Sequence, residues 1–99
     1  MISISQDQRR QIVSILRRFL PTDCRVVVFG SRLGSDHHQY SDLDICVIGE
    51  VEMSDLKWSD MLQTIAETDL PFKVDLSRFD DLPASFQEDV RTRGIDLLP

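Results

Sequence analysis

The sequence predicts an α/β (α+β) fold in which a small mixed β-sheet has helices packed on one face. Some segments carry apolar residues three and four positions apart, as amphipathic helices do. Others are short runs rich in β-branched residues, as buried strands are, and glycine or proline ends several of them. Because 99 residues leave room for only one hydrophobic core, we expect residues 1–99 to form a single domain.

The first predicted helix covers residues 5–20. Ser5 and Gln8 have the spacing of a capping box, and Pro21 stops the helix. Residues 25–29 follow as a short, almost continuously apolar strand, which indicates that both of its faces are covered. Further along we expect a strand over 43–48, a helix after Ser54, a strand over 72–76, a last helix and a short edge strand over 95–98.

The last helix is predicted from a four-residue repeat. Leu82, Phe86 and Val90 recur every four residues, and Gly94 stands where a left-handed C-cap would end the helix. A small sheet with helices over one face is the natural packing for this order of elements.

Composition and charge narrow the classes of function. With 41% hydrophobic and 28% charged residues, the chain has the composition of an ordinary soluble globular protein. The net charge is −6, so nucleic acid is not expected as a partner, since duplex binding relies on basic side chains. An acidic surface suits a basic protein partner better, and a bound triphosphate would require metal ions to offset the repulsion.

The cysteines and the apolar runs give no indication of export or of a membrane. Cys24 and Cys46 lie beside or within apolar segments and form no CxxC motif, so we expect buried, reduced thiols. No apolar stretch approaches the ~20 residues that cross a bilayer. We therefore expect a cytoplasmic protein with no membrane association.

Two carboxylates stand at the start of the second predicted strand. Since successive side chains of a strand alternate between faces, Asp42 and Asp44 share one face, with Cα atoms about 6.5 Å apart. Their mutual repulsion favours a cation between them, and their oxygen atoms could reach a pair of Mg²⁺ ions ~3.5–4 Å apart. Asp75, on a neighbouring apolar segment, could close the same cluster. Taken singly, each of these acids could equally be a solvated residue on the exposed side of a strand.

A glycine turn precedes this pair. Gly30 ends a buried strand and lets the backbone approach a ligand, while the hydroxyl and N–H of Ser31 can face phosphate oxygens. Arg32 adds a positive charge where a pyrophosphate leaving group would develop negative charge. The alternative is an ordinary turn with a capping serine and a solvated arginine.

The combination of these features is far more specific than any one of them. The pattern Gly-Ser-x10-Asp-x-Asp would occur by chance in about one in a thousand chains of this length. In this context the chain resembles the DNA polymerase β-like nucleotidyltransferase superfamily, in particular its minimal members, the MntA-type antitoxins of HEPN/MNT toxin–antitoxin modules. The resemblance covers nearly the whole chain, from the opening helix to the closing amphipathic helix.

The resemblance implies a set of residue roles. Asp42 and Asp44 would hold two Mg²⁺ ions, and Asp75 would complete the site and help to deprotonate the attacking hydroxyl. Gly30 and Ser31 would bind the β- and γ-phosphates of ATP. The implied activity is transfer of AMP to a hydroxyl, with tyrosine the expected acceptor, of a cognate HEPN-type toxin, which is thereby neutralised.

Two alternatives remain open from the sequence. The chain could be a non-catalytic antitoxin that binds and occludes its toxin, or an aminoglycoside-type transferase of small molecules. The short length favours a protein acceptor, because larger relatives that modify other acceptors add a domain to hold them. His37, His38 and Tyr40 lie in the polar loop, where solvent-exposed or loop-anchoring side chains are the simpler interpretation.

Overall fold

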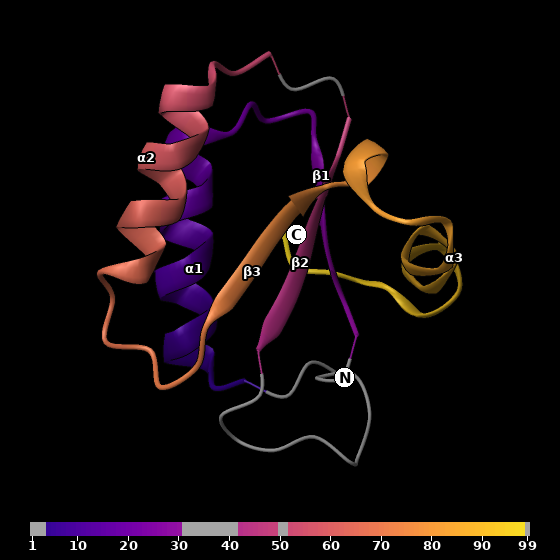
Figure 1. Cartoon of the computed structure of the whole chain (residues 1–99). Helices are drawn as coiled ribbons and strands as arrows, with labels where there is room; N and C mark the ends of the chain where they lie inside the picture. Colours follow the sequence, from indigo (N-terminus) through magenta and orange to yellow (C-terminus); the bar gives the residue numbers. More distant parts are fainter. Residues whose placement is uncertain (1–3, 31–41, 50–51, 99) are drawn as a thin grey trace.

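The computed structural model describes residues 4–30, 42–49 and 52–98. Apart from an additional 3₁₀ turn, the order of elements along this part of the chain is the predicted one (Figure 1). The elements are α1 (Gln6–Phe19), β1 (Arg25–Phe29), β2 (Leu43–Ile48), α2 (Asp55–Ala66), β3 (Val74–Arg78), the 3₁₀ turn η2 (Phe79–Asp81), α3 (Ala84–Arg93) and β4 (Ile95–Asp96). Leu82, predicted in the last helix, instead follows the 3₁₀ turn and precedes α3.

The strands form one mixed sheet in the order β3-β2-β1-β4. β1 pairs antiparallel with both β2 and β4, whereas β2 pairs parallel with β3. The parallel pair requires a crossover, which α2 provides on one face of the sheet. The small mixed sheet that the sequence predicts is therefore confirmed.

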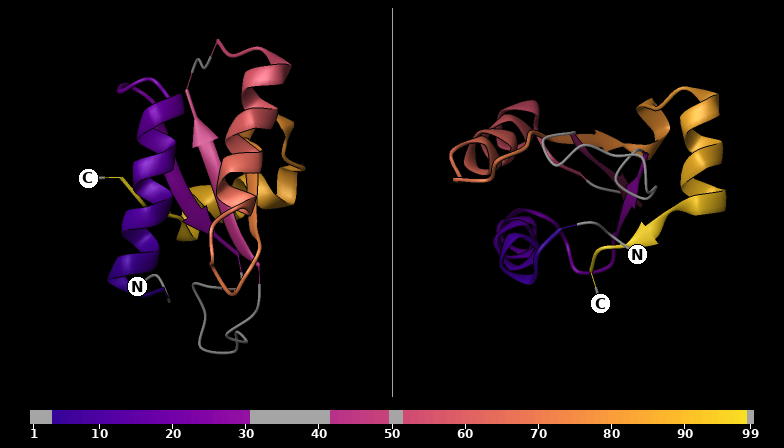
Figure 2. Two further views of the ribbon diagram at one scale, coloured as in Figure 1. Left: turned by 90° about the vertical axis from the view of Figure 1, so that its left-hand side faces the viewer. Right: turned by 90° about the horizontal axis from the view of Figure 1, so that it is seen from below.

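The helices lie on both faces of the sheet. Seen from below, α1 and α2 lie together on one side and α3 lies on the opposite side (Figure 2). The expectation that the helices pack on one face thus holds for α1 and α2, but α3 differs. The physical reason lies in β1, whose continuous apolar run buries Val26 and Val28 toward α1 and α2, and Val27 and Phe29 toward α3.

Two hydrophobic clusters correspond to these two faces. The larger one joins α1 and α2 to the sheet, and its members with no exposed surface are Ile12, Leu16, Val28, Leu43, Ile45, Met61 and Leu97. The smaller cluster under α3 consists of Val27, Phe29, Cys46 and Val90. Alternation along β2 therefore assigns Asp44 to the face of Cys46, which is the face under α3. Asp44 therefore lies on the opposite side of the sheet from the large core, next to the smaller cluster.

The ends of two helices show how local sequence sets the boundaries. At α1 the predicted capping box is present: the Gln8 N–H donates to the Ser5 hydroxyl at 3.1 Å, and the Ser5 N–H donates to the Gln8 side chain at 2.9 Å. The prediction of a left-handed cap at Gly94 is wrong, because its φ is −62° and its ψ 144°. Instead, the missing Cβ allows the end of α3 to approach Val27 and the carbonyl of Val90.

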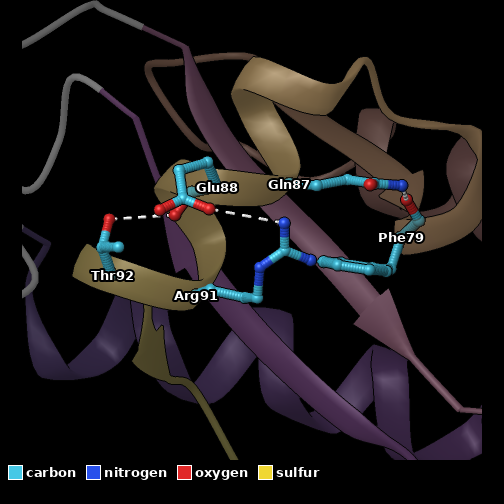
Figure 3. A network of polar contacts seen from close by, with 5 residues as sticks. All are labelled: Phe79, Gln87, Glu88, Arg91 and Thr92. Atoms are coloured by element: carbon cyan, nitrogen blue, oxygen red, sulfur yellow. Dashed lines mark hydrogen bonds and ion pairs between the residues drawn. The ribbon is translucent and has the colours of Figure 1, made fainter.

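Contacts with the 3₁₀ turn fix the other side of α3. The Gln87 amide donates to the carbonyl of Phe79 at 3.0 Å, and the Arg91 guanidinium lies 5.7 Å from the centre of the Phe79 ring (Figure 3). Together with Val90 in the smaller cluster, these contacts attach α3 firmly to the sheet.

The prediction of buried, reduced cysteines is also confirmed. Cys24 and Cys46 are both buried and free. Burial raises the pKa of Cys46 to about 11, so this thiol stays protonated. Across the described residues, no helix is both long enough and apolar enough to span a membrane.

Candidate active site

Two of the predicted site residues lie side by side in the sheet. Asp44 on β2 and Asp75 on β3 are direct partners in the parallel pairing. On the other side of β2, Asp44 pairs with Phe29, the last residue of β1. The sequence placed Asp75 in a strand over 72–76, whereas β3 covers Val74–Arg78, so the strand lies two residues later than predicted and still includes Asp75.

Of the other predicted site residues, those between Gly30 and strand β2, the structure describes only Asp42. Asp42 directly precedes β2 and is exposed. It lies close enough to Asp44 for its charge to affect that carboxyl. Ser31 and Arg32, as well as His37, His38 and Tyr40, lie outside the described residues.

Gly30 has a backbone conformation and a close contact with Asp44 that only glycine allows. Its φ is +84°, a region that side chains rarely occupy, and a Cβ at this position would collide with the Asp44 carboxylate. The Gly30 N–H donates to a carboxylate oxygen of Asp89 on α3 at 3.1 Å. Glycine is thus required here for the turn itself and for the space that Asp44 fills.

Asp44 occupies an unfavourable environment for a negative charge. Partial burial, followed in importance by the charges of Asp75, Asp42 and Asp89, raises the pKa of Asp44 to about 6. A cation beside these carboxylates would reverse the effect, because it stabilises the ionised form.

A cavity of about 410 Å³ opens beside these carboxylates. Its polar wall carries Asp44 and Asp75, and its apolar wall includes Phe86, which is 52% exposed and packs 6.2 Å from the ring of Phe29. The remaining lining residues are Phe29, Gly30, Ser77, Asp81, Leu82, Pro83 and Asp89. The cavity combines acidic groups suited to metal ions with an apolar surface suited to an organic ligand.

Comparison with known proteins decides the family. Residues 10–98 match the family model described as polymerase beta, nucleotidyltransferase. The chain belongs to the polymerase β-type nucleotidyltransferase family. It is 31% identical over 90 residues to a probable protein adenylyltransferase, MntA, from Haemophilus influenzae, and the match covers 91% of this chain and 78% of that protein.

Solved structures agree with the family assignment. A toxin–antitoxin structure with AMP-PNP superposes with a TM-score of 0.71 at 26% identity, covering 90% of this chain and 71% of that one. A complex of a tri-AMPylated HEPN toxin with an MNT antitoxin from Shewanella oneidensis has a TM-score of 0.69 at 23% identity, with coverage of 95% and 71%. The second similarity shows that the nucleotidyltransferase fold is shared.

The carboxylates of this nucleotidyltransferase fit a hard divalent cation in their chemistry. Asp44 and Asp75 supply oxygen ligands from two neighbouring strands, as Mg²⁺ prefers. Within residues 4–30, 42–49 and 52–98, however, no three His, Cys, Asp or Glu side chains are gathered closely enough to hold an ion. The ligand roles of Asp42, Asp44 and Asp75 therefore stay predictions.

Sequence reasoning did not single out two residues of the nucleotidyltransferase site. Asp89 contacts Gly30 from α3, although 59 positions separate the two residues along the chain. Phe86 belongs to the four-residue apolar repeat, yet half of its surface is exposed at the cavity. Their helical spacing indicates that both lie on α3, but only the packing of α3 on the sheet brings them to the carboxylates.

The raised pKa of Asp44 predicts how stability depends on pH without metal ions. The pKa is 3.8 in the unfolded chain and about 6 in the folded one, so the folded state binds more protons between these values. The stability contributed by protonated Asp44 is complete below pH 3.8 and is lost as the pH rises through about 6. After discounting for solvent screening, we expect a loss of about 1 kcal/mol.

Chemical denaturation in EDTA at pH 4, 5, 6 and 7 measures this effect. Because other carboxylates also titrate, the quantity to compare is the free energy of unfolding of the wild type minus that of Asp44→Asn. This difference should fall with rising pH, whereas the same difference for Asp69→Asn, an exposed control, should stay flat. A difference that does not change with pH for Asp44→Asn would show that burial and neighbouring charges do not raise the pKa of Asp44.

Proposed function

We propose that this chain is a Mg²⁺-dependent protein adenylyltransferase of the antitoxin type. It transfers AMP from ATP to a hydroxyl, with tyrosine the expected acceptor, of a cognate HEPN-type toxin in the cytoplasm, and so neutralises the toxin. The observation that carries the proposal is the pairing of Asp44 with Asp75 beside Gly30, at the edge of a cavity, in a nucleotidyltransferase. We further propose that residues 1–99 work as one domain.

Each predicted residue has a role in this proposal. Asp42 and Asp44 hold two Mg²⁺ ions, with Asp75 as a third ligand from β3. When bound, these ions lower the pKa of the acceptor hydroxyl and neutralise charge on the entering and leaving oxygens. Gly30 and Ser31 bind the triphosphate, and Arg32 faces the departing pyrophosphate.

The chemical step is a displacement at the α-phosphorus of ATP. The acceptor oxygen forms a bond to the α-phosphorus while the bond from that phosphorus to the β-phosphate oxygen breaks. Asp75 orients the acceptor hydroxyl and accepts its proton, and pyrophosphate departs past the glycine turn. Asp75 is suited to this role because it is exposed at the cavity, whereas Asp44 is partly buried.

Two comparisons support ATP and a protein acceptor. The Haemophilus relative is named as a probable protein adenylyltransferase, and a structure at 26% identity is a toxin–antitoxin complex with the ATP analogue AMP-PNP. A cognate toxin, which brings its own hydroxyl to the carboxylates, is the partner that this similarity favours.

Mass spectrometry of the partner protein tests the proposal. The wild-type chain, incubated with ATP, Mg²⁺ and its cognate HEPN-type toxin, should add one or more AMP units to the toxin. EDTA should abolish the adducts. A toxin that keeps its unmodified mass under all these conditions would refute adenylyl transfer.

One variant distinguishes neutralisation by AMP transfer from neutralisation by occlusion. Asp75→Asn preserves the size of an exposed side chain, so it should leave the fold intact and remove transfer. If Asp75→Asn still neutralises the toxin at equal concentration, occlusion is sufficient. If neutralisation disappears with the adducts, catalysis is required. A small-molecule transferase would instead consume ATP with an aminoglycoside and ignore the toxin.

A further inference from the structure

We propose that Asp89 is a positioning residue for nucleotidyl transfer. Its carboxylate holds the Gly30 turn in the orientation that leaves space for Asp44 and presents the turn to the triphosphate. The inference rests on the proposed function, because the turn and Asp44 are assigned there to ATP and to metal ions.

One of the two contacts of Asp89 is directed toward the site. One oxygen accepts the Gly30 N–H at 3.1 Å, and the other lies 3.4 Å from a guanidinium nitrogen of Arg93, one turn along α3. The Asp89 side chain is only 24% exposed, whereas Arg93 is 56% exposed. Asp89 is therefore held between the helix surface and the sheet, and one of its oxygens accepts the hydrogen bond from Gly30.

The turn at Gly30 depends on this contact for its orientation. β1 ends at Phe29, so the strand pairing that fixes the backbone stops one residue before Gly30. A partly buried N–H needs an acceptor, and the carboxylate of Asp89 provides a strong one. If the peptide rotated, the Gly30 Cα would move relative to the Asp44 carboxylate, which fills the space that a Cβ would need.

The helix that carries Asp89 is itself fixed in place. Phe86, one turn before Asp89, packs against the ring of Phe29, and Val90 packs in the smaller core cluster. The neighbouring Glu88 differs, because it points along the helix surface to Arg91 at 3.4 Å and is well exposed (Figure 3). Glu88 is thus a matched control with the same charge, on the same helix and next in sequence, but directed away from the site.

The experiment compares three variants in the toxin adenylylation assay with saturating MgATP. Asp89→Ala removes the acceptor, and we expect kcat to fall on the order of tenfold to a hundredfold, as small misplacements of a reactive group do. Asp89→Asn retains an oxygen that can accept the Gly30 N–H, and should restore kcat to within about threefold of the wild type. Glu88→Ala should match the wild type in kcat, and the KM for the toxin should be the same in all four proteins.

Two results of the transfer assay would overturn the proposal. If Asp89→Asn is as slow as Asp89→Ala, the charge and not the hydrogen bond is needed; if Asp89→Ala is as fast as Glu88→Ala, Asp89 positions nothing. Amide hydrogen exchange of Gly30 in the wild type provides a test that does not depend on variants or on activity. Its N–H should be protected, and exchange at the rate of an open amide would contradict the contact even if transfer is observed.

Hydrogen exchange of Gly30 and the transfer assay together distinguish failure of the proposed function from failure of the positioning role of Asp89. A wild type that modifies no toxin but protects the Gly30 N–H refutes the proposed function and remains consistent with the hydrogen bond to Asp89. A wild type that modifies the toxin while its activity is insensitive to Asp89→Ala refutes only the positioning role.

Discussion

An Asp44→Asn variant is expected to transfer AMP on the order of a thousandfold more slowly than the wild type, because several kcal/mol of metal-assisted charge stabilisation would be lost. The same variant should be more stable than the wild type at neutral pH without metal ions, since it removes the carboxylate whose pKa is raised to about 6. Opposite effects on activity and stability are typical of a residue kept for function and not for folding.

Initial rates of toxin modification at saturating MgATP measure the first effect, and thermal unfolding in EDTA measures the second. Asp69→Asn is the matched control: it makes the same chemical change at an exposed position after α2 and should alter neither quantity. If Asp44→Asn retained more than a tenth of the wild-type rate, Asp44 would not be a ligand of a catalytic ion.

Gly30→Ala is expected to affect both stability and activity. The new methyl group would occupy the place of the Asp44 carboxylate, and φ of +84° is unfavourable for alanine. We expect the free energy of unfolding to fall by about 1–3 kcal/mol. Because Asp44 must move, kcat should fall by about a hundredfold.

Gly49→Ala is a control that introduces backbone strain without displacing the Asp44 carboxylate. Gly49 also has a positive φ, of +129°, but a Cβ there would lie at an ordinary 3.5 Å from Cys24, at the opposite end of β2 from Asp44. Chemical denaturation should therefore show a loss of stability in both variants, while the transfer assay should show a loss of kcat only in Gly30→Ala. Equal kcat values for the two variants would mean that backbone strain, and not the position of Asp44, limits the reaction.

The placement of α3 explains why the site lies where it does. α1 and α2 bury one face of the sheet in the main core, whereas α3 covers only part of the other face. At the uncovered end of that face, Asp44 and Asp75 meet a cavity whose second wall is α3 itself. A helix that stabilises the sheet with Val90 thus also supplies Asp89 and Phe86 to the site.

Local patterns in the sequence were sufficient for the elements and for part of the candidate site. The capping box at Ser5, the apolar run after Arg25 and the alternation around Asp44 depend on residues close together in the chain, and each appears in the structure as expected. The sequence allowed Asp75 to close the cluster with Asp44 but did not require it; the parallel pairing of β2 with β3 places the two residues side by side.

What only the tertiary structure decided was the side of the sheet on which α3 packs. No local pattern distinguishes the two faces of β1, since both are apolar. That choice determines that Asp89 meets Gly30, that Phe86 lines a cavity and does not join the core, and that Gly94 serves close packing and not a left-handed cap. The sequence by itself determined which residues are strands, helices and candidate ligands, because those depend on spacing; contacts between distant segments depend on how whole elements pack.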